Sequence, residues 1–404
     1  MSETMKRRDF LSKTLAGTAL AVSAAAIPTQ AARDTEPKAE FRNKQDGMAY
    51  RRLGRTGYMV SEVVMGGNTI SPTNFKHVEF AIERGLNYLD TSPAYGKGRS
   101  EKGYGEVVGR SSMREKVFLN SKVSVFDNSR NEFYQKLYDS LDDGEKKKVD
   151  GEIHEMLERR RILKTPYFGP YFKGQINEVL KSYLSNVMEK HYGEKIDRRK
   201  VYYDHIISSA EESLKRLKTD YLDLFMCPHG ANSPEEVRIP EVYEAMDKLK
   251  RDGKIRFVGL SAHADSAGIL SAAIETGMYD AAMVGYNVMN GDFVDSAICS
   301  AWEHDVGVIA MKVARAVYPN RKPKVKVPKS RLDKLNHAIP GRMSTPKKAY
   351  LWALQNPNIA CVNSDMSSEE LVRDNLPLAG QKVKLVPPED IKKIKYLDGE
   401  HEYY

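Results

Sequence analysis

The chain alternates short apolar runs with amphipathic stretches from about residue 61 to residue 364. The apolar runs are rich in β-branched residues, and several amphipathic stretches end at Gly or Asp-Gly just before the next run. This alternation is typical of βαβ units. We therefore expect strands at residues 61–67, 87–92, 117–124, 221–229, 255–262, 281–287, 306–313 and 359–364.

Eight such units favour a closed (β/α)8 TIM barrel over an open doubly wound sheet. The first expected strand does not lead into a GxGxxG turn, which is the dinucleotide fingerprint of the open fold. Ahead of it, "YRRLGRTGYMVSEV" predicts a hairpin that turns at residues 54–57. We assign the barrel to residues 49–384, a linker to residues 32–48 and a C-terminal tail to residues 385–404.

One crossover, at residues 125–200, is unusually long. It is highly charged, yet it carries helical patches and an aromatic cluster, "TPYFGPYFKG". This composition predicts a helical insertion after the third strand. A segment that leaves the carboxyl end of a barrel strand emerges on the active-site face, so a lid or a subunit contact is one interpretation. Solvated helical decoration is the other.

The first 31 residues have the pattern of a signal peptide. Arg7 and Arg8 precede Phe10 and Leu11, and an Ala-rich apolar stretch ends in "PTQA" before a cleavage site after Ala31. The paired arginines resemble the twin-arginine class, which carries folded proteins. We expect export to the periplasm with the twin-arginine machinery as a partner. No later stretch is long and apolar enough to span a membrane, so no stable span is expected after cleavage.

Composition narrows the function further. The chain is 41% hydrophobic and 9% aromatic, which is typical of a packed globular protein. The net charge of +8 lies largely in mixed runs, and without a nucleic-acid motif we expect no nucleic-acid partner. Cys227, Cys299 and Cys361 are widely separated, so they predict core residues and neither a disulfide scaffold nor a metal site.

Polar residues stand where three successive strands end. Asp90 ends the second expected strand, Tyr95 follows in its loop, Lys122 ends the third and His229 ends the fourth. Taken singly, Asp90 could be a helix cap, Lys122 a surface amine and His229 a turn residue. Together they occupy the face on which barrel active sites are assembled.

These four groups suit one reaction. A tyrosine has a pKa of about 10, and a nearby ammonium lowers it. Lys122 could act in this way on Tyr95, Asp90 could hold Lys122, and His229 could orient a carbonyl oxygen. Such a set protonates an oxygen while a hydride attacks the carbon.

Four motifs in order resemble the aldo-keto reductase family, from about residue 50 to residue 378 outside the long crossover. They are "YRRLGRTGYMVSEVVMGG", "LDTSPAYG…SEKGYGEVVG", "SLKRLKTDYLDLFMCPHG" and "AMKV". The resemblance implies an (α/β)8 barrel that uses NADPH or NADH. It also implies a catalytic tetrad of Asp90, Tyr95, Lys122 and His229, with Tyr95 as the proton donor.

The resemblance also implies a set of cofactor-binding residues: Gly67, Ser261, Tyr286, Lys312, Ser364, Met366, Ser367, Glu370 and Asn375. Three positions depart from the family pattern. The usual Ser-Asn pair is Ser261-Ala262, the usual glutamine of the sixth strand is Met283, and the Arg or Lys that grips a 2′-phosphate is missing after the eighth strand. The choice between NADP and NAD therefore stays open.

The leading hypothesis is an NAD(P)-dependent oxidoreductase that acts on a small-molecule carbonyl or alcohol. The alternative is a catalytically weak or inactive barrel that serves as a nucleotide-binding sensor or an interaction subunit. A metal-dependent hydrolase on the same fold lacks clustered His and carboxylate ligands. Because free nicotinamide nucleotides are scarce outside the cytoplasm, we expect an exported enzyme to retain its cofactor tightly.

Overall fold

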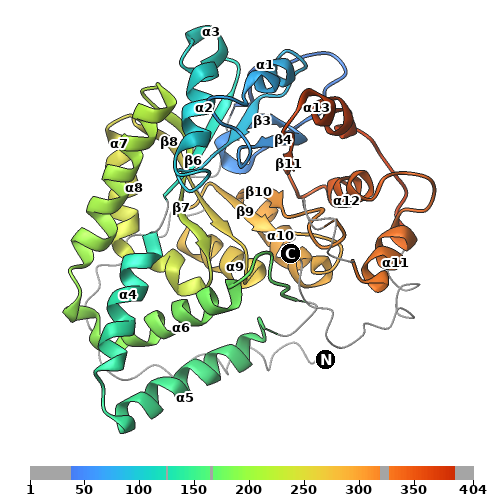
Figure 1. The fold of residues 1–404 in the computed structure, drawn as a ribbon. Coiled ribbons are helices and arrows are strands. Elements are labelled where there is room, and N and C mark those ends of the chain that lie inside the picture. Colours follow the sequence, from blue (N-terminus) through green and yellow to red (C-terminus); the bar gives the residue numbers. More distant parts are fainter. Residues whose placement is uncertain (1–37, 124–125, 164–166, 319–326, 387–404) are drawn as a thin grey trace, which may run out of the picture. The chain divides into compact units, whose positions relative to one another are not determined.

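A computed structural model describes residues 38–123, 126–163, 167–318 and 327–386. Its centre is a closed barrel of eight parallel strands in the order β10-β11-β4-β5-β6-β7-β8-β9 (Figure 1). The strands are β4 (Val63–Gly66), β5 (Tyr88–Asp90), β6 (Phe118–Lys122), β7 (Leu222–Ala231), β8 (Ile255–Ala262), β9 (Ala281–Gly285), β10 (Gly307–Met311) and β11 (Cys361–Asp365). Each strand lies at a predicted position, so the (β/α)8 barrel is confirmed.

Helices surround the barrel, as Figure 1 shows. Several of them bury an apolar face against the strands, as in α8, where Val242, Ala245, Met246 and Leu249 are buried. The helices of this layer are α1 (Lys76–Ile82), α2 (Arg99–Val108), α3 (Ser111–Arg114), α7 (His205–Leu217), α8 (Pro240–Arg251), α9 (Ser266–Thr276), α10 (Gly291–Glu303), α11 (Lys329–Ala338), α12 (Thr345–Leu354) and α13 (Glu369–Asn375).

The barrel interior is a packed core and not a pore. Side chains from several strands form one buried apolar cluster there, with Tyr88, Phe118, Leu224, Met283 and Ile309 among its members. Polar side chains are therefore displaced to the two ends of the barrel, where the strands give way to loops.

A small sheet packs against this interior cluster. β2 (Tyr50–Arg52) pairs antiparallel with β3 (Tyr58–Ser61), which confirms the predicted hairpin. β1 (Glu40–Phe41) adds to the other edge of β3 in parallel. Tyr58 of β3 stacks on Phe118 of the barrel, with ring centroids 4.0 Å apart.

The linker prediction for residues 32–48 was wrong in its described part, because residues 38–48 belong to the folded body. The reason is a tertiary contact that local sequence cannot show. Arg42, just after β1, forms an ion pair with the fully buried Asp223 at 3.0 Å, and its guanidinium lies 4.5 Å from the ring centroid of Phe118.

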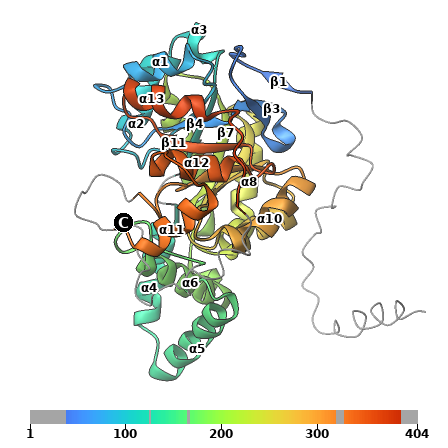
Figure 2. The same ribbon diagram turned by 90° about the vertical axis from the view of Figure 1, so that its right-hand side faces the viewer.

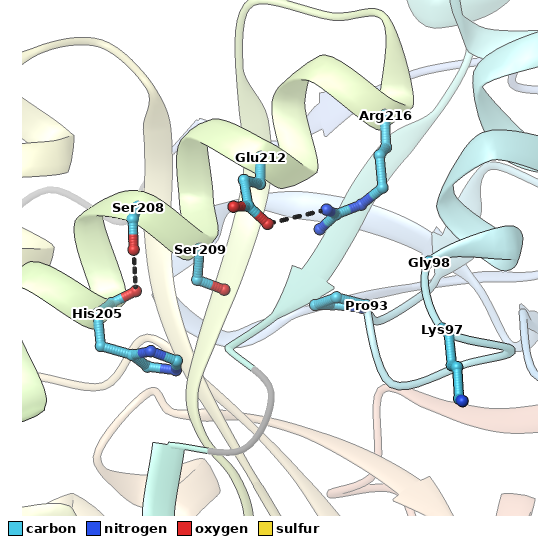
Figure 3. A pocket seen from close by; sticks show the side chains of 8 residues that line it. All are labelled: Pro93, Lys97, Gly98, His205, Ser208, Ser209, Glu212 and Arg216. Carbon is cyan, nitrogen blue, oxygen red and sulfur yellow. Dashed lines mark hydrogen bonds and ion pairs between the residues drawn. The ribbon is translucent and has the colours of Figure 1, made fainter. Parts of the chain in front are cut away.

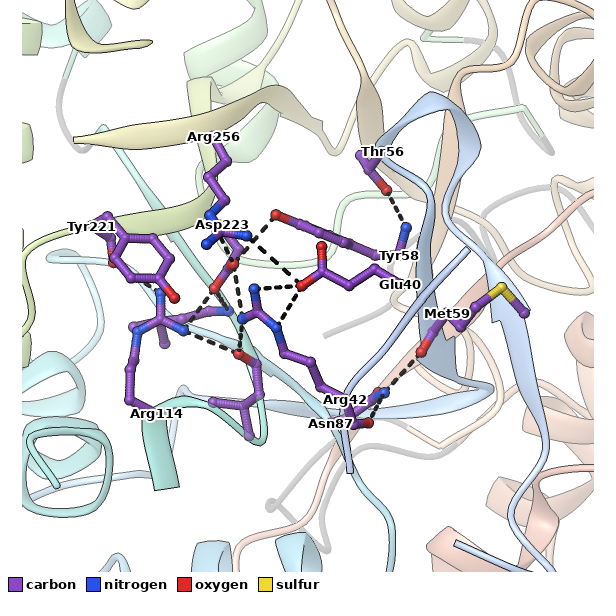
Figure 4. Close-up of polar contacts among 12 residues, drawn as sticks. Glu40, Arg42, Thr56, Tyr58, Met59, Asn87, Arg114, Tyr221, Asp223 and Arg256 are labelled. Atoms are coloured by element: carbon purple, nitrogen blue, oxygen red, sulfur yellow. Dashed lines mark hydrogen bonds and ion pairs between the residues drawn. The ribbon is translucent and has the colours of Figure 1, made fainter. Parts of the chain in front are cut away.

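Asp223 is the centre of a polar network beneath the barrel (Figure 4). Besides Arg42, it pairs with Arg114 at 2.8 Å. It also accepts hydrogen bonds from the Leu119 N–H at 2.9 Å and from the Tyr58 hydroxyl at 3.3 Å. One carboxylate thus ties β1, β3, β6 and α3 to the start of β7.

The long crossover between β6 and α7 contains α4 (Phe126–Asp139), α5 (Asp143–Arg160) and α6 (Gln175–Tyr192). Helices were predicted here, and α5 begins with a capping box made by Asp142 and Glu145. The three helices lie together, to one side of the barrel, in both ribbon views (Figures 1 and 2). That they are an insertion relative to other barrels of this kind stays a prediction.

Some predicted segments lie outside the described residues, namely the signal peptide at residues 1–31 and residues 387–404 of the tail. Within the described part of the chain, no helix is both long and apolar enough to cross a membrane.

Candidate active site

The four predicted catalytic residues meet at one end of the barrel. Asp90 and Lys122 are the last residues of β5 and β6, and His229 lies near the end of β7. Tyr95 lies in the loop between β5 and α2. Because these three strands are neighbours in the barrel, residues far apart in sequence become adjacent.

Lys122 is the hub of this group. Its ammonium donates hydrogen bonds to a carboxylate oxygen of Asp90, to the Thr91 carbonyl at 2.9 Å and to the Tyr95 hydroxyl at 3.3 Å. The side chains of Lys122 and Asp90 are 0% and 1% exposed. Burial alone would lower the pKa of Lys122, but Asp90 and Tyr95 outweigh it and the pKa is raised. Lys122 therefore stays charged at neutral pH.

Two asparagines that the sequence analysis missed complete the surroundings of Asp90. Asn120 donates to one carboxylate oxygen at 2.6 Å, and Asn363 donates to the other at 3.1 Å. Asn120 lies two residues before Lys122 on β6, so strand alternation places both side chains on the inner face. That spacing was a usable signal. Asn363 comes from β11, and nothing local links it to Asp90.

The net pKa shift of Tyr95 is opposite to the prediction. Burial raises the pKa of this phenol, Lys122 lowers it and Asp90 raises it, and the sum is an upward shift. The predicted effect of Lys122 is therefore present, but burial exceeds it. Tyr95 is protonated at neutral pH in this structure, which is the form that a proton donor requires.

His229 lies edge-on to Tyr95, with ring centroids 6.0 Å apart. Burial, reinforced by the positive charges of Lys122 and Lys312, lowers the pKa of His229 to about 3. The imidazole is thus neutral across the physiological range. Its Nδ1 lies 3.3 Å from the Ser92 hydroxyl. Because Nδ1 is engaged there, Nε2 is the ring nitrogen that is left to contact another group.

Lys312 lies just past the end of β10. Arg315 and His263 lie near it and form, with Lys312, a basic group beside the tetrad. The Lys312 φ of 58° is in the left-handed region, which is uncommon for a residue with a side chain and clusters at functional sites. Burial, together with Arg315 and Lys122, lowers the pKa of Lys312 to about 8. Burial and the same lysines also hold the pKa of His263 well below its usual value.

Ser261 is a predicted cofactor residue that the structure places beside the tetrad. It pairs with His229 in the β7–β8 register. Its hydroxyl is buried and has no hydrogen-bond partner in the described structure. A buried hydroxyl without a partner is costly, and a bound ligand would satisfy it.

Four other predicted cofactor residues are engaged in packing. The ring of Tyr286 stacks on Trp352 at 4.9 Å, and its hydroxyl donates to Asp295 at 2.7 Å, so the side chain belongs to the helix layer. Met366 is fully buried in the apolar core. The side chain of Asn375 donates to the Ser364 hydroxyl at 3.0 Å.

The remaining three predicted positions lie near β4 and β11. A Cβ on Gly67 would come within 2.5 Å of the Asp90 carbonyl, so the glycine permits close packing of the strand end. Ser367 is half-buried after β11, and Glu370 is exposed on α13. The structure brings neither of these two into contact with the tetrad.

The model of the aldo/keto reductase family matches residues 63–168 and 171–398. The chain belongs to this family. Membership of this family, together with the similarity to oxidoreductases, supports the conclusion that this chain is an oxidoreductase.

Two curated relatives show how far the sequence of this aldo/keto reductase has diverged within the family. It is 22% identical over 374 residues to the uncharacterized oxidoreductase YqkF of Bacillus subtilis, a match that covers 86% of this chain and 96% of the relative. It is 27% identical over 229 residues to the aldo-keto reductase AMT2 of Alternaria alternata, covering 54% of this chain and 50% of the relative.

Solved structures show the same fold. The aldo-keto reductase AKR11C1 from Bacillus halodurans, in its holo form, matches with a TM-score of 0.56 at 20% identity, over 88% of this chain and all of that one. An aldo-keto reductase from Klebsiella pneumoniae in complex with NADPH matches with a TM-score of 0.51 at 17% identity, over 86% and 94% of the two chains.

A cavity of about 320 Å³ in this aldo/keto reductase lies beside the loop that carries Tyr95 (Figure 3). It separates that loop from α7, and none of the tetrad residues lines it. Its lining residues are Pro93, Lys97, Gly98, His205, Ser208, Ser209, Glu212 and Arg216. Within the described ranges, no group of three or more His, Cys, Asp or Glu side chains could hold a metal ion.

Proposed function

We propose that this aldo/keto reductase interconverts a carbonyl and an alcohol by hydride transfer, with a nicotinamide nucleotide as the hydride carrier and Tyr95 as the proton donor. The observation that carries the proposal is the contact between the Tyr95 hydroxyl and the Lys122 ammonium at 3.3 Å. Lys122 is itself held by Asp90 and Thr91. The aldo-keto reductase from Klebsiella pneumoniae is in complex with NADPH, and its similar fold supports this choice of cofactor.

Two residues at the barrel mouth suit such a nucleotide. Ser261 offers a buried hydroxyl that lacks a partner in the described structure, and it would hold the carboxamide. Lys312 would face a phosphate, since its amine lies in a basic environment with Arg315. When bound there, the nucleotide supplies a hydride to the carbonyl carbon in reduction and accepts one in oxidation.

Tyr95 supplies the proton that balances this hydride. During reduction, the proton leaves the phenol oxygen and joins the carbonyl oxygen as that oxygen gains negative charge. The Lys122 ammonium, 3.3 Å away, stabilises the phenolate that remains. Asp90 keeps Lys122 charged and in place, so its role is to position and not to transfer a proton. Oxidation of an alcohol runs the same steps in reverse.

His229 orients the substrate oxygen. A neutral imidazole can donate one hydrogen bond without competing for the proton of Tyr95, and the pKa of about 3 keeps this ring neutral. With Nδ1 near the Ser92 hydroxyl, Nε2 is the nitrogen that contacts the substrate.

The test is a Tyr95→Phe variant assayed with a generic aldehyde and either NADPH or NADH. We expect kcat to fall at least about 100-fold, because general acid catalysis is lost, while nucleotide affinity is retained. Tyr134→Phe is the matched control. That tyrosine is buried in α4, and its hydroxyl has no partner among the described residues.

The same experiment separates the enzyme from a nucleotide-binding sensor. Ala262 and Met283 stand where the family pattern has amide side chains, which favours the sensor as the second candidate. A wild-type protein that binds nucleotide, turns over nothing and is unchanged by Tyr95→Phe would support the sensor and refute the enzyme.

A further inference from the structure

Residues 167–172, which precede α6, pack near the ends of β8, β9 and β10 on the side of the tetrad. The Tyr167 hydroxyl donates to Asp265, which caps α9 just after β8. The Phe172 ring lies edge-on to His263, with centroids 6.2 Å apart. An aromatic stretch of the long crossover therefore packs on the loops of the candidate site.

Tyr171 is the central contact of this stretch with the barrel, and the residue is 2% exposed. Its hydroxyl accepts a hydrogen bond from Asn287 at 2.9 Å, and its carbonyl accepts one from Arg315 at 3.2 Å. The Lys312 amine lies 6.0 Å from its ring centroid. A Cβ on Gly285 would come within 3.2 Å of the Tyr171 hydroxyl, so Tyr171 packs closely against the end of β9.

Helix α6, which follows this stretch, is tied to α4 and to a loop of the barrel. Arg130 of α4, with 1% of its side chain exposed, pairs with Glu189 of α6 at 2.8 Å and donates to Asn186 at 2.6 Å. Asn186 in turn donates to the Ser233 hydroxyl at 2.8 Å, in the loop that follows β7. Buried polar contacts of this kind are costly to break one at a time.

We propose that Tyr171 is a ligand-retaining residue, which closes the β9–β10 side of the site over a bound nicotinamide nucleotide. This inference rests on the proposed function. A nucleotide held by Ser261 and Lys312 would lie against Tyr171, because Lys312 itself does. Tyr286, which was expected at this strand end, is turned into the helix layer. Release across β9 and β10 then requires Tyr171 to give up its contacts with Asn287 and Arg315.

The test measures nucleotide release directly. Full-length wild type, Tyr171→Phe and Tyr171→Ala are loaded with NADPH or NADH, and the loss of bound-nucleotide fluorescence is followed after mixing with excess competitor. We expect release to be about five-fold faster in Tyr171→Phe, which loses the hydrogen bond from Asn287. In Tyr171→Ala, which loses the buried ring, we expect about 30-fold. The rate of hydride transfer from prebound nucleotide in a single turnover, measured on the same samples, separates a change in the chemical step from a change in nucleotide release.

Tyr134→Phe again serves as the control and should release nucleotide at the wild-type rate. Equal release rates in all variants, with normal binding and turnover, would overturn the role of Tyr171 and leave the proposed function standing. Nucleotide binding that appears only in Tyr171→Ala would show that Tyr171 occludes the site, which also overturns the inference. Failure of every protein to bind either nucleotide would overturn the proposed function and this inference with it.

Discussion

Lys122 has no exposed side-chain surface and yet keeps its charge. A lone buried ammonium would shed its proton, so the charge depends on Asp90 and on the phenol beside it. Asp90 depends in turn on Asn120 and Asn363, which satisfy its two oxygens. The proton donation that we propose for Tyr95 would therefore depend on the set and not on the tyrosine alone.

A Lys122→Met variant tests this dependence. Lys122 is the group that lowers the pKa of Tyr95, while burial and Asp90 raise it. Removing the ammonium should raise that pKa further and move the alkaline limb of kcat/KM for carbonyl reduction to higher pH. We expect kcat to fall about 100-fold. The measurement is a pH–rate profile, with Lys116→Met, an exposed lysine after α3, as the control. An unmoved alkaline limb would contradict the role of Lys122.

At this scale, the sequence predicted which four residues gather, because strand ends of one barrel share one face. It did not predict the net direction of the Tyr95 pKa shift, which depends on burial by residues distant in sequence. The sequence also did not predict that the Tyr286 side chain points outward, into the helix layer. Its partners Asp295 and Trp352 lie on α10 and α12, and a strand pattern cannot say on which side of a sheet a terminal tyrosine packs.

At the scale of elements, the eight barrel strands could be predicted because each is a short apolar run with a helical pattern or a turn after it. β1 could not, since two residues are too few to show any period. Its place is set by the Arg42–Asp223 pair, and an arginine among the charged residues 32–48 looks like part of a solvated linker.

An Asp223→Asn variant measures what this network contributes. It would leave Arg42 and Arg114 without their buried counter-charge, so we expect a loss of about 3–5 kcal/mol in the free energy of unfolding. Asp305→Asn removes a partly exposed pair with Arg52 and should cost less than about 1 kcal/mol. Urea unfolding gives both values. The Asp223 network lies at the opposite end of the barrel from the candidate active site. The nucleotide affinity of Asp223→Asn, measured below the unfolding transition, should therefore match that of wild type. A large loss of affinity would contradict the separation of the network from the site.

At the scale of the whole molecule, the export and the cofactor retention that we propose depend on each other. We propose that residues 1–31 direct the chain to the periplasm through the twin-arginine route. That route carries folded proteins, so a nucleotide bound in the cytoplasm could accompany the chain. A closed site such as the one inferred around Tyr171 would then keep the nucleotide where no replacement is available.

Replacing Arg7 and Arg8 together by lysine tests the export proposal. We expect the variant to remain in the cytoplasm, folded and loaded with nucleotide, while the wild type appears in the periplasmic fraction. Immunoblots of the two fractions, and mass spectrometry of the small molecule released from each purified protein, provide the measurement. A Lys6→Gln variant, which keeps the arginine pair, should be exported normally. Periplasmic wild type that carries no nucleotide would contradict the retention argument.

The helices α4, α5 and α6 build much of their own small apolar cluster, with Tyr134, Val149, Val187 and Met188 buried in it. The tetrad draws its support from other strands and loops. The proposed retention of the nucleotide by Tyr171 is thus encoded in one continuous stretch, apart from the residues proposed to carry out proton transfer. Substitutions in this stretch could retune ligand selectivity during evolution while the inherited chemistry stays intact.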